Sequence, residues 1–236
     1  MKLLVSDYDG TIFDFENIRE TRKNIDAIKR FRDNDNLFAI ATARTFSSIK
    51  YQTDKFKISY DYLICSDGGC VFDNKDNLIY SNSISPKLLL SIYSYLRSLP
   101  FVKKINFLDS FGRTTDDVND VQQIYVEVYF TNTLDFLKIK RKLASLQNIG
   151  ILNMCYFYKK TLKTDGIRII RDIENLDKKD IFTIGNGNND ICMLREYNGS
   201  RVPYSYPKVV LQNFPKNSVY NLVKKIESGN IWKKSE

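Results

Sequence analysis

The chain has 236 residues, of which 36 are Lys or Arg and 28 are Asp or Glu, so its formal net charge is +8, and it contains no histidine. The absence of histidine excludes an imidazole general base, a Ser-His-Asp triad and zinc or haem sites built on His. Acid–base chemistry is left to carboxylates, Lys, Tyr or Cys. A chain of this length buries roughly 70% of its unfolded surface, enough for one larger domain or two modest ones.

The cysteines and the apolar runs indicate a protein of the reducing cytosol. The four cysteines show no paired C-x-x-C spacing, so we expect free thiols rather than a zinc site at Cys65, Cys70, Cys155 and Cys192. The apolar run at residues 3–5 is too short for a secretion signal, and no run approaches the roughly 20 residues that span a bilayer. We therefore expect a cytoplasmic protein with no membrane partner.

The positive charge does not by itself indicate nucleic-acid binding. Basic residues are scattered along the chain and interleaved with acidic ones. This pattern is typical of a solvated surface that steers small anions. We expect no nucleic-acid partner.

The first third of the chain alternates short apolar runs with amphipathic stretches. Strands are predicted at residues 3–6, 37–41 and 62–65, with helices at about 21–34 and 45–54 between them. This alternation is typical of a parallel sheet covered by helices. A hairpin is predicted between residues 68 and 80, where two apolar pairs flank a run of turn-forming residues.

From about residue 83 the pattern changes to that of an inserted α+β unit. A helix is predicted from Pro86 to Leu99, followed by long alternating strands, a helix and another strand. In the clearest strand, residues 122–130, Ile124 and Val126 share one face, and Tyr125 shares the other with residues 127 and 129. One face is expected to pack, while the other can meet a partner domain.

After Thr161 the α/β pattern resumes. The sequence predicts a helix at about 164–175, a strand at 181–184, a glycine-rich turn, a helix that carries Ile191, Met193 and Leu194, a weak strand near 201–202 and a last helix at 219–227. The predicted fold class is α/β: a Rossmann-like parallel-sheet core (residues 1–82 and 162–236) with an inserted α+β domain (83–161).

Two carboxylates follow the first predicted strand, in the sequence Asp7-Tyr8-Asp9-Gly10-Thr11. Open α/β sheets bind ligands at the carboxyl ends of their strands, so both acids can face one crevice. There, one can be ionised as a nucleophile or metal ligand while the other is protonated as an acid. The alternative is an ordinary Asp-Gly turn.

Three further strand or helix ends carry parts suited to phosphoryl transfer. Thr42 ends the second strand and offers a hydroxyl and nearby N–H groups for phosphate oxygens, with Arg44 two residues later. Lys163 precedes a helix and can neutralise carboxylates and a phosphoryl group. The turn at residues 185–190, Gly-Asn-Gly-Asn-Asn-Asp, offers close backbone approach and oxygen ligands suited to Mg²⁺. Each of these parts also has an ordinary structural interpretation when taken alone. Thr42 can be a helix cap, Lys163 a solvated lysine, and the turn a glycine loop with Asn caps.

Taken together, in this order, the four segments resemble the motifs of the haloacid dehalogenase superfamily. DYDGT resembles the first motif, ATART the second, Lys163 the third, and GNGNND the fourth, which is usually GDGxND. The resemblance covers essentially the whole chain. It is to the Cof-like phosphatases, whose large α/β cap is inserted after the third core strand.

The resemblance implies a reaction and assigns residues to it. Asp7 would attack phosphorus to form an aspartyl-phosphate, and Asp9 would protonate the leaving alcohol and then activate water. The implied groups are phosphate-binding Thr42, Ala43 and Lys163; Mg²⁺ ligands Asp7, Asp9 (through its carbonyl), Asn186 and Asp190; and supporting residues Gly10, Thr11, Arg44 and Asn189. The expected cofactor is Mg²⁺, and the expected partner is a small phosphorylated substrate.

Three positions depart from the family pattern. Asn186 stands where the family usually has a metal-binding Asp, which removes one full charge from a site for a hard cation. Its amide oxygen can still coordinate, and Asp190 keeps a carboxylate one helical turn later. Ala43 replaces a common Gly, and Asp67 replaces a common Asn; Asp67 can face the cap side of the site or simply open the hairpin turn.

The residues leave three functions open. The leading hypothesis is a Mg²⁺-dependent phosphomonoester hydrolase for a small metabolite, with a sugar phosphate favoured by family analogy. A sugar phosphomutase is a second enzyme class. The change at Asn186 also permits a catalytically silent protein that binds a phosphorylated ligand. The sequence does not determine the substrate or the oligomeric state.

Overall fold

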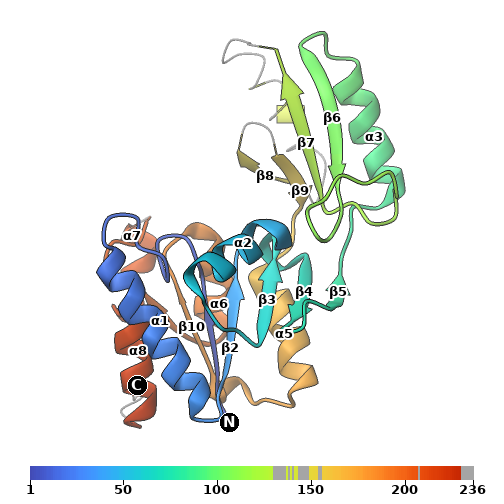
Figure 1. Cartoon of the computed structure of the whole chain (residues 1–236). Helices are drawn as coiled ribbons and strands as arrows, with labels where there is room; N and C mark the ends of the chain where they lie inside the picture. The colour runs from blue at the N-terminus through green and yellow to red at the C-terminus, as the bar shows by residue number, and fades with distance from the viewer. Residues whose placement is uncertain are drawn as a thin grey trace.

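The main sheet of the computed structural model has seven strands in the order β11-β10-β1-β2-β3-β4-β5 (Figure 1). The structure describes residues 1–129, 137, 139, 141–142, 149–153, 156–206 and 208–229. Five strands are parallel: β1 (Leu3–Ser6), β2 (Leu37–Ala41), β3 (Tyr62–Cys65), β10 (Ile181–Gly185) and β11 (Asn198–Arg201). Two add on antiparallel: β4 (Cys70–Asp73) and β5 (Leu78–Ser81).

Helices cover both faces of this sheet, as the alternating pattern predicts. One face carries α1 (Ile18–Asp33), α2 (Phe46–Phe56) and α8 (Val219–Glu227). The other carries α5 (Lys163–Ile173), α6 (Ile191–Glu196) and α7 (Lys208–Leu211). Short 3₁₀ turns are η1 (Ser66–Gly68), η2 (Lys178–Asp180) and η3 (Asn188–Asp190). Leu4 of β1 faces the first layer and Leu3 and Val5 face the second, so the strand is apolar on both faces up to Ser6.

The order of strands places the ligand-binding edge at β1. Leu3 of β1 pairs with Ile181 of β10 on one side and with Leu37 of β2 on the other. Strands β2 and β3 therefore lie on one side of β1, and β10 and β11 lie on the other. Open α/β sheets bind ligands in the crevice at the carboxyl ends of strands where the order changes direction in this way.

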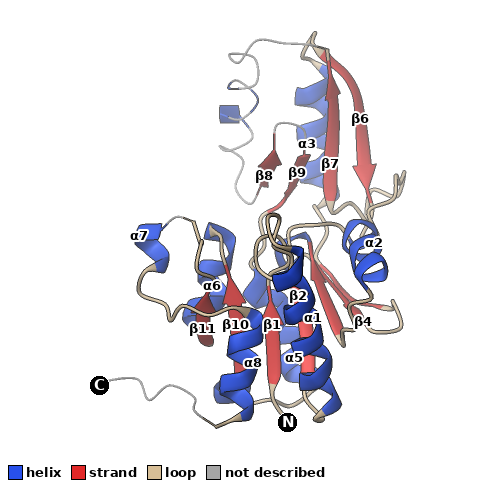
Figure 2. Ribbon diagram, turned by 60° about the vertical axis from the view of Figure 1, so that its left-hand side comes forward, coloured by secondary structure: helices blue, strands red, loops and turns tan. Residues whose placement is uncertain are grey.

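The inserted unit forms a second, antiparallel sheet in the order β6-β7-β9-β8. Its elements are α3 (Pro86–Arg97), β6 (Val102–Leu108), β7 (Gln123–Val128), β8 (Ile149–Asn153) and β9 (Tyr156–Lys159). Ile124 and Val126 of β7 are buried in a core that includes Leu89 and Ile92 of α3, whereas Tyr129 is 60% exposed. Figures 1 and 2 both show the unit on the side of the main sheet where β2 ends.

The predicted fold class is confirmed, while several element boundaries differ from the predictions. Helix α1 begins at Ile18 instead of near 21 because the Asn17 side chain accepts hydrogen bonds from the N–H groups of Arg19 and Glu20. Helix α2 runs past residue 54 and ends where Lys57 adopts a left-handed conformation. Strand β11 lies before residue 202 rather than across it. The domain boundaries at 82/83 and 161/162 stay a prediction.

The thiols that the structure describes are free, as predicted. Cys65 and Cys70 are buried and lie opposite each other in the β3–β4 pairing, and Cys192 is half-buried. Cys155 lies outside the described residues. Burial raises the pKa of both the Cys65 and the Cys70 thiol, so neither is a ready nucleophile. Within the described ranges, no helix has the length and apolar character needed to cross a membrane.

Candidate active site

Asp7 is the first residue after β1 and lies at the carboxyl edge of the main sheet. Its backbone N–H donates to the Ile184 carbonyl of β10 at 3.0 Å, which continues the sheet pairing by one residue. Its side chain is almost completely buried. One carboxylate oxygen accepts from Lys163 Nζ at 2.6 Å, and the other accepts from Thr11 Oγ1 at 3.2 Å. The sheet thus fixes both the position and the orientation of this carboxylate.

Lys163 is fully buried and bridges two carboxylates. It is the first residue of α5, and its ammonium lies 2.6 Å from both Asp7 Oδ1 and Asp190 Oδ1. Burial by itself lowers the pKa of Lys163, but the two carboxylates outweigh burial and raise the pKa above its ordinary value. Lys163 is therefore a permanent cation at this site.

The Asp7 carboxyl is poised between its two protonation states. Burial raises its pKa to about 7, and the charge of Asp190 adds to the rise, while Lys163 opposes it. With both acids ionised, one lysine faces two buried carboxylates, so the trio carries one excess negative charge. A bound cation would balance this charge.

Asp190 organises the glycine-rich turn after β10. Its second oxygen, Oδ2, accepts from the backbone N–H groups of Asn186 and Gly187, both at 2.8 Å. A Cβ at Gly185 would lie 2.4 Å from Asp190 Cγ, so only glycine permits this close approach. Both oxygens of Asp190 are therefore engaged, one by Lys163 and one by the turn.

Asp9 is held by a bidentate ion pair on the other side of the turn. Arg44 Nε and Nη2 each lie 2.7 Å from an oxygen of the Asp9 carboxylate. The remaining Nη1 donates to Ser48 Oγ at 3.0 Å, and the Arg44 backbone N–H donates to Thr42 Oγ1 at 3.2 Å. The bond to Asp9 raises the pKa of the guanidinium. The planar fork fixes the carboxylate in one orientation.

The turn after β3 also lies at the carboxyl edge of the main sheet. Ser66, Asp67 and Gly68 all have positive φ angles of 52°, 52° and 98°. The Asp67 N–H donates to the Thr42 carbonyl at 3.0 Å, and its carboxylate accepts from Asn189 Nδ2 at 2.9 Å. Asp67 is thus a buried link between the second and fourth motifs.

The side chain of Asn186 lies against the first motif. Gly10 has a φ of +74°, and a Cβ there would come within 2.2 Å of Asn186 Nδ2. This close approach places the Asn186 amide beside Gly10 of the first motif. Carboxylate, amide and backbone carbonyl oxygens are the donors that a hard divalent cation prefers. The donor set therefore fits Mg²⁺, although among the described residues no three Asp, Glu or Cys side chains form a metal-binding group.

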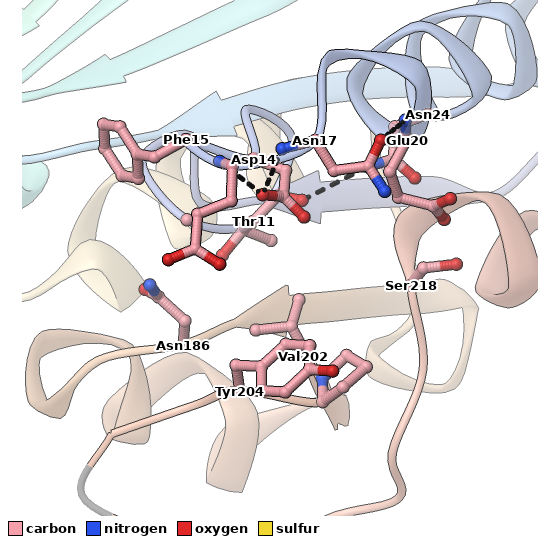
Figure 3. A pocket seen from close by; sticks show the side chains of 13 residues that line it. Thr11, Asp14, Phe15, Asn17, Glu20, Asn24, Asn186, Val202, Tyr204 and Ser218 are labelled. Carbon is pink, nitrogen blue, oxygen red and sulfur yellow. Dashed lines mark hydrogen bonds between the residues drawn. The ribbon is translucent and has the colours of Figure 1, made fainter.

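A cavity of about 750 Å³ adjoins this cluster. It is bounded by the β1–α1 loop, by Asn186, and by the segment after β11 that includes Val202 and Tyr204. Figure 3 shows the Asn186 side chain across from the loop that bears Thr11 and Asp14. The catalytic candidates Asp7 and Asp9 are not among its lining residues, so the cavity lies beside the carboxylate cluster rather than around it.

The structure brings together most of the residues singled out in the sequence. Asp7, Thr11, Lys163 and Asp190 are in direct contact, and Asp9, Arg44 and Thr42 form a second connected group. Asn189 contacts Asp67 instead of either group. Ala43 lies between Thr42 and Arg44 and is half-buried. Their roles in binding and catalysis stay predictions.

Ser48 is the contact that the sequence reasoning did not anticipate. It stands on the first turn of α2, whereas Arg44 lies before the N-cap Thr45, outside the helix. The helical spacing rule therefore does not predict this contact, and no other local pattern in the sequence marks it.

Comparison with known proteins identifies the family. Residues 4–160 match the family described as haloacid dehalogenase-like hydrolase. An uncharacterized protein of Mycoplasma capricolum is 26% identical over 148 residues, which are 58% of this chain and only 55% of that protein. A Haemophilus influenzae protein, named as a presumed phosphatase, is 23% identical over 222 residues, 82% of this chain and 81% of that protein.

A solved structure shows the same fold over the whole length. It is a sugar phosphatase of subclass IIB of the haloacid dehalogenase superfamily, 18% identical, with a TM-score of 0.68 over 98% of this chain and 100% of the other. The chain belongs to the haloacid dehalogenase-like hydrolase family. This confirms the resemblance seen in the four motifs and the predicted enzyme class, a haloacid dehalogenase-type hydrolase.

Proposed function

We propose that the chain is a Mg²⁺-dependent phosphomonoester hydrolase that acts through an aspartyl-phosphate on Asp7. The observation that carries the proposal is the pair of carboxylates at the edge of β1: Asp7 is held by Lys163, and Asp9 is held separately by Arg44. Two carboxylates with different partners can take different roles in one reaction.

The first displacement transfers the phosphoryl group to Asp7. A carboxylate oxygen of Asp7 attacks phosphorus, the bond from phosphorus to the leaving oxygen breaks, and Asp9 gives a proton to that oxygen. Lys163 neutralises the transferring oxygens, and Thr42 and the backbone at Ala43 offer hydrogen-bond partners for them. In the second displacement Asp9 takes a proton from water, whose oxygen attacks phosphorus and frees Asp7.

Mg²⁺, when bound, supplies positive charge that screens the phosphate from the carboxylates and lowers the pKa of Asp7. The residues that would hold it are Asp7, the Asp9 carbonyl and Asn186. Asp190 stays a predicted ligand, and in this structure its oxygens also hold Lys163 and the turn in position.

We infer a small phosphorylated metabolite as the substrate, with a sugar phosphate as the first candidate. The fold is shared with a sugar phosphatase over the whole length of both chains, and the inserted unit stands above the carboxylate edge, where it would cover a bound substrate. This placement favours a compact substrate that is enclosed between the two sheets.

The test is phosphate release from a panel of sugar phosphates, nucleotides and an aryl phosphate, with Mg²⁺ or with a chelator. We expect turnover that requires Mg²⁺ and is lost in Asp7→Asn, whereas Asp26→Asn, on the exposed face of α1, retains it. A product that is isomerised rather than hydrolysed would instead identify a phosphomutase. A melting shift with a substrate but no phosphate release at saturating Mg²⁺ would identify a silent binding protein.

A further inference from the structure

A tight loop of the inserted unit is built to keep one shape. It comprises residues 109–113, between β6 and β7, and is called the docking loop here. The Asp109 carboxylate accepts from the backbone N–H groups of Phe111 and Arg113 at 2.9 and 2.8 Å, and the Gly112 N–H donates to the Asp109 carbonyl at 2.9 Å. The loop is therefore braced by its own first residue.

The docking loop rests on the first turn of α2 in the core. The Ser47 N–H donates to the Phe111 carbonyl at 3.0 Å. The Phe111 ring packs edge-on against Phe46 and Phe72, with centroids 5.4 and 5.2 Å apart. Two aromatic contacts and a backbone hydrogen bond together make this a specific junction rather than a chance approach.

Gly112 brings the two backbones together closely. Its φ is +82°, and a Cβ at this position would lie 2.6 Å from Thr45 Cβ and 2.8 Å from Ser47 Oγ. Only glycine combines this φ with this closeness. The inserted unit is thus fastened to the core at a third place, in addition to the two segments that connect it along the chain.

The turn that receives the docking loop is also the turn that holds Asp9. Thr45, which touches Gly112, caps α2 by accepting from the Ser48 N–H. Ser48 Oγ accepts from Arg44 Nη1 at 3.0 Å, and Arg44 carries the bidentate pair with Asp9. A continuous series of contacts therefore joins the docking loop to the Asp9 carboxylate.

We propose that the docking loop is a positioning element for Asp9. Phe111 and Gly112 fix the first turn of α2 and so hold Ser48 and Arg44 in position. From that position the Arg44 guanidinium orients the Asp9 carboxylate. The catalytic part of this proposal rests on the proposed function, in which Asp9 protonates the leaving group.

The test compares two substrates that differ in their need for a general acid. Nitrophenyl phosphate has a good leaving group, whereas glycerol phosphate has a poor one and depends on proton donation. In Phe111→Ala and Gly112→Val we expect kcat for glycerol phosphate to fall by about tenfold or more, with kcat for nitrophenyl phosphate within about threefold of wild type. Phe111→Leu, which keeps an apolar side chain, is expected to restore most of the loss.

A matched control removes a phenylalanine from the same unit but not from the docking loop. Phe107 packs with Tyr93 inside the inserted unit. Phe107→Ala should destabilise that unit while leaving the ratio of the two kcat values unchanged. Equal losses on both substrates in Phe111→Ala would overturn the positioning role.

A second measurement does not depend on activity. The Arg44 Nε–H, which donates to Asp9, is expected to exchange slowly with solvent in an NMR spectrum of the wild type and at least about tenfold faster in Phe111→Ala and Gly112→Val. Unchanged exchange in both variants would overturn the proposal. If the wild type releases no phosphate but the exchange rates change as expected, the loop positions Asp9 and only the proposed function is wrong.

Discussion

The replacement of Asp7 by Asn is expected to stabilise the fold at neutral and alkaline pH. Burial raises the pKa of Asp7 to about 7 from an ordinary value of 3.8, so the ionised carboxylate is less stable in the folded protein than in water. Asn has nearly the same shape and no charge to desolvate. Lys163 keeps its second partner, Asp190, in the variant.

The magnitude follows from the difference in pKa between the folded and the unfolded chain. Each tenfold change in a proton equilibrium is about 1.4 kcal/mol, so the step from 3.8 to about 7 corresponds to an upper value of about 4 kcal/mol. Between these pH values the folded protein binds more protons than the unfolded chain. The stability of the wild type relative to Asp7→Asn therefore falls as pH rises from about 4 to 7 and is constant above that window.

The assay is urea unfolding with a chelator present, followed by circular dichroism at pH 5 and pH 8, for the wild type, Asp7→Asn and the exposed control Asp26→Asn. The advantage of Asp7→Asn should be larger at pH 8 by about 2 kcal/mol or more, while the control should stay within about 0.5 kcal/mol of the wild type. The same advantage at both pH values, or a loss of stability at pH 8, would refute the reasoning.

Three further variants test other parts of the site. Lys163→Met should abolish phosphatase activity. It should also lower the free energy of unfolding in urea by about 3–5 kcal/mol, because two buried carboxylates lose their shared cation. A loss of stability under about 1 kcal/mol would contradict this. Asn186→Asp should lower both the Mg²⁺ concentration for half-maximal activity and the dissociation constant measured by calorimetry, since a carboxylate binds a hard cation more strongly than an amide; unchanged or raised values would contradict it. Gly68→Ala should lower the free energy of unfolding by about 3 kcal/mol or more, because its φ is +98° and a Cβ would meet the Leu162 carbonyl at 2.0 Å. The control Gly229→Ala, with a φ of +69° and open space around the Cβ, should lower it by only about 1 kcal/mol. Equal losses in urea unfolding would show that the contact with Leu162 is unimportant.

The layered core and the grouping of the motifs could be predicted because both depend on local pattern. Central parallel strands are mostly apolar runs, and the carboxyl ends of adjacent strands meet at one edge. These two rules suffice to bring Asp7, Thr42 and the turn at residues 185–190 together before any coordinates are known. Burial of Ile124 and Val126 on one face of β7 follows from the same kind of rule, the period of two in a strand.

The partners of individual carboxylates could not be predicted in this way. Asp190 was predicted as a metal ligand, and the structure adds contacts that the sequence did not predict: its oxygens accept from Lys163 and from two backbone N–H groups. The sequence left two interpretations of Asp67, as a turn residue or as a residue that faces the site. The hydrogen bond that Asn189 donates to its carboxylate places Asp67 at the edge of the site. Such choices depend on distances of a few tenths of an ångström between residues far apart in the sequence, and no local pattern encodes them.

The inserted unit leaves the core and returns to it at nearly the same place. The Thr161 hydroxyl donates to the Ser66 carbonyl at 3.1 Å, and Lys159 near the returning end contacts Asn82 and Ser83 near the departing end. Linking two points that are already adjacent needs only a short loop, whose closure entropy is small. The core can therefore exchange one insertion for another during evolution without rebuilding the edge that carries its carboxylates. A new insertion would inherit that edge, but it would have to supply its own contact to the first turn of α2 to position Asp9 as the docking loop does.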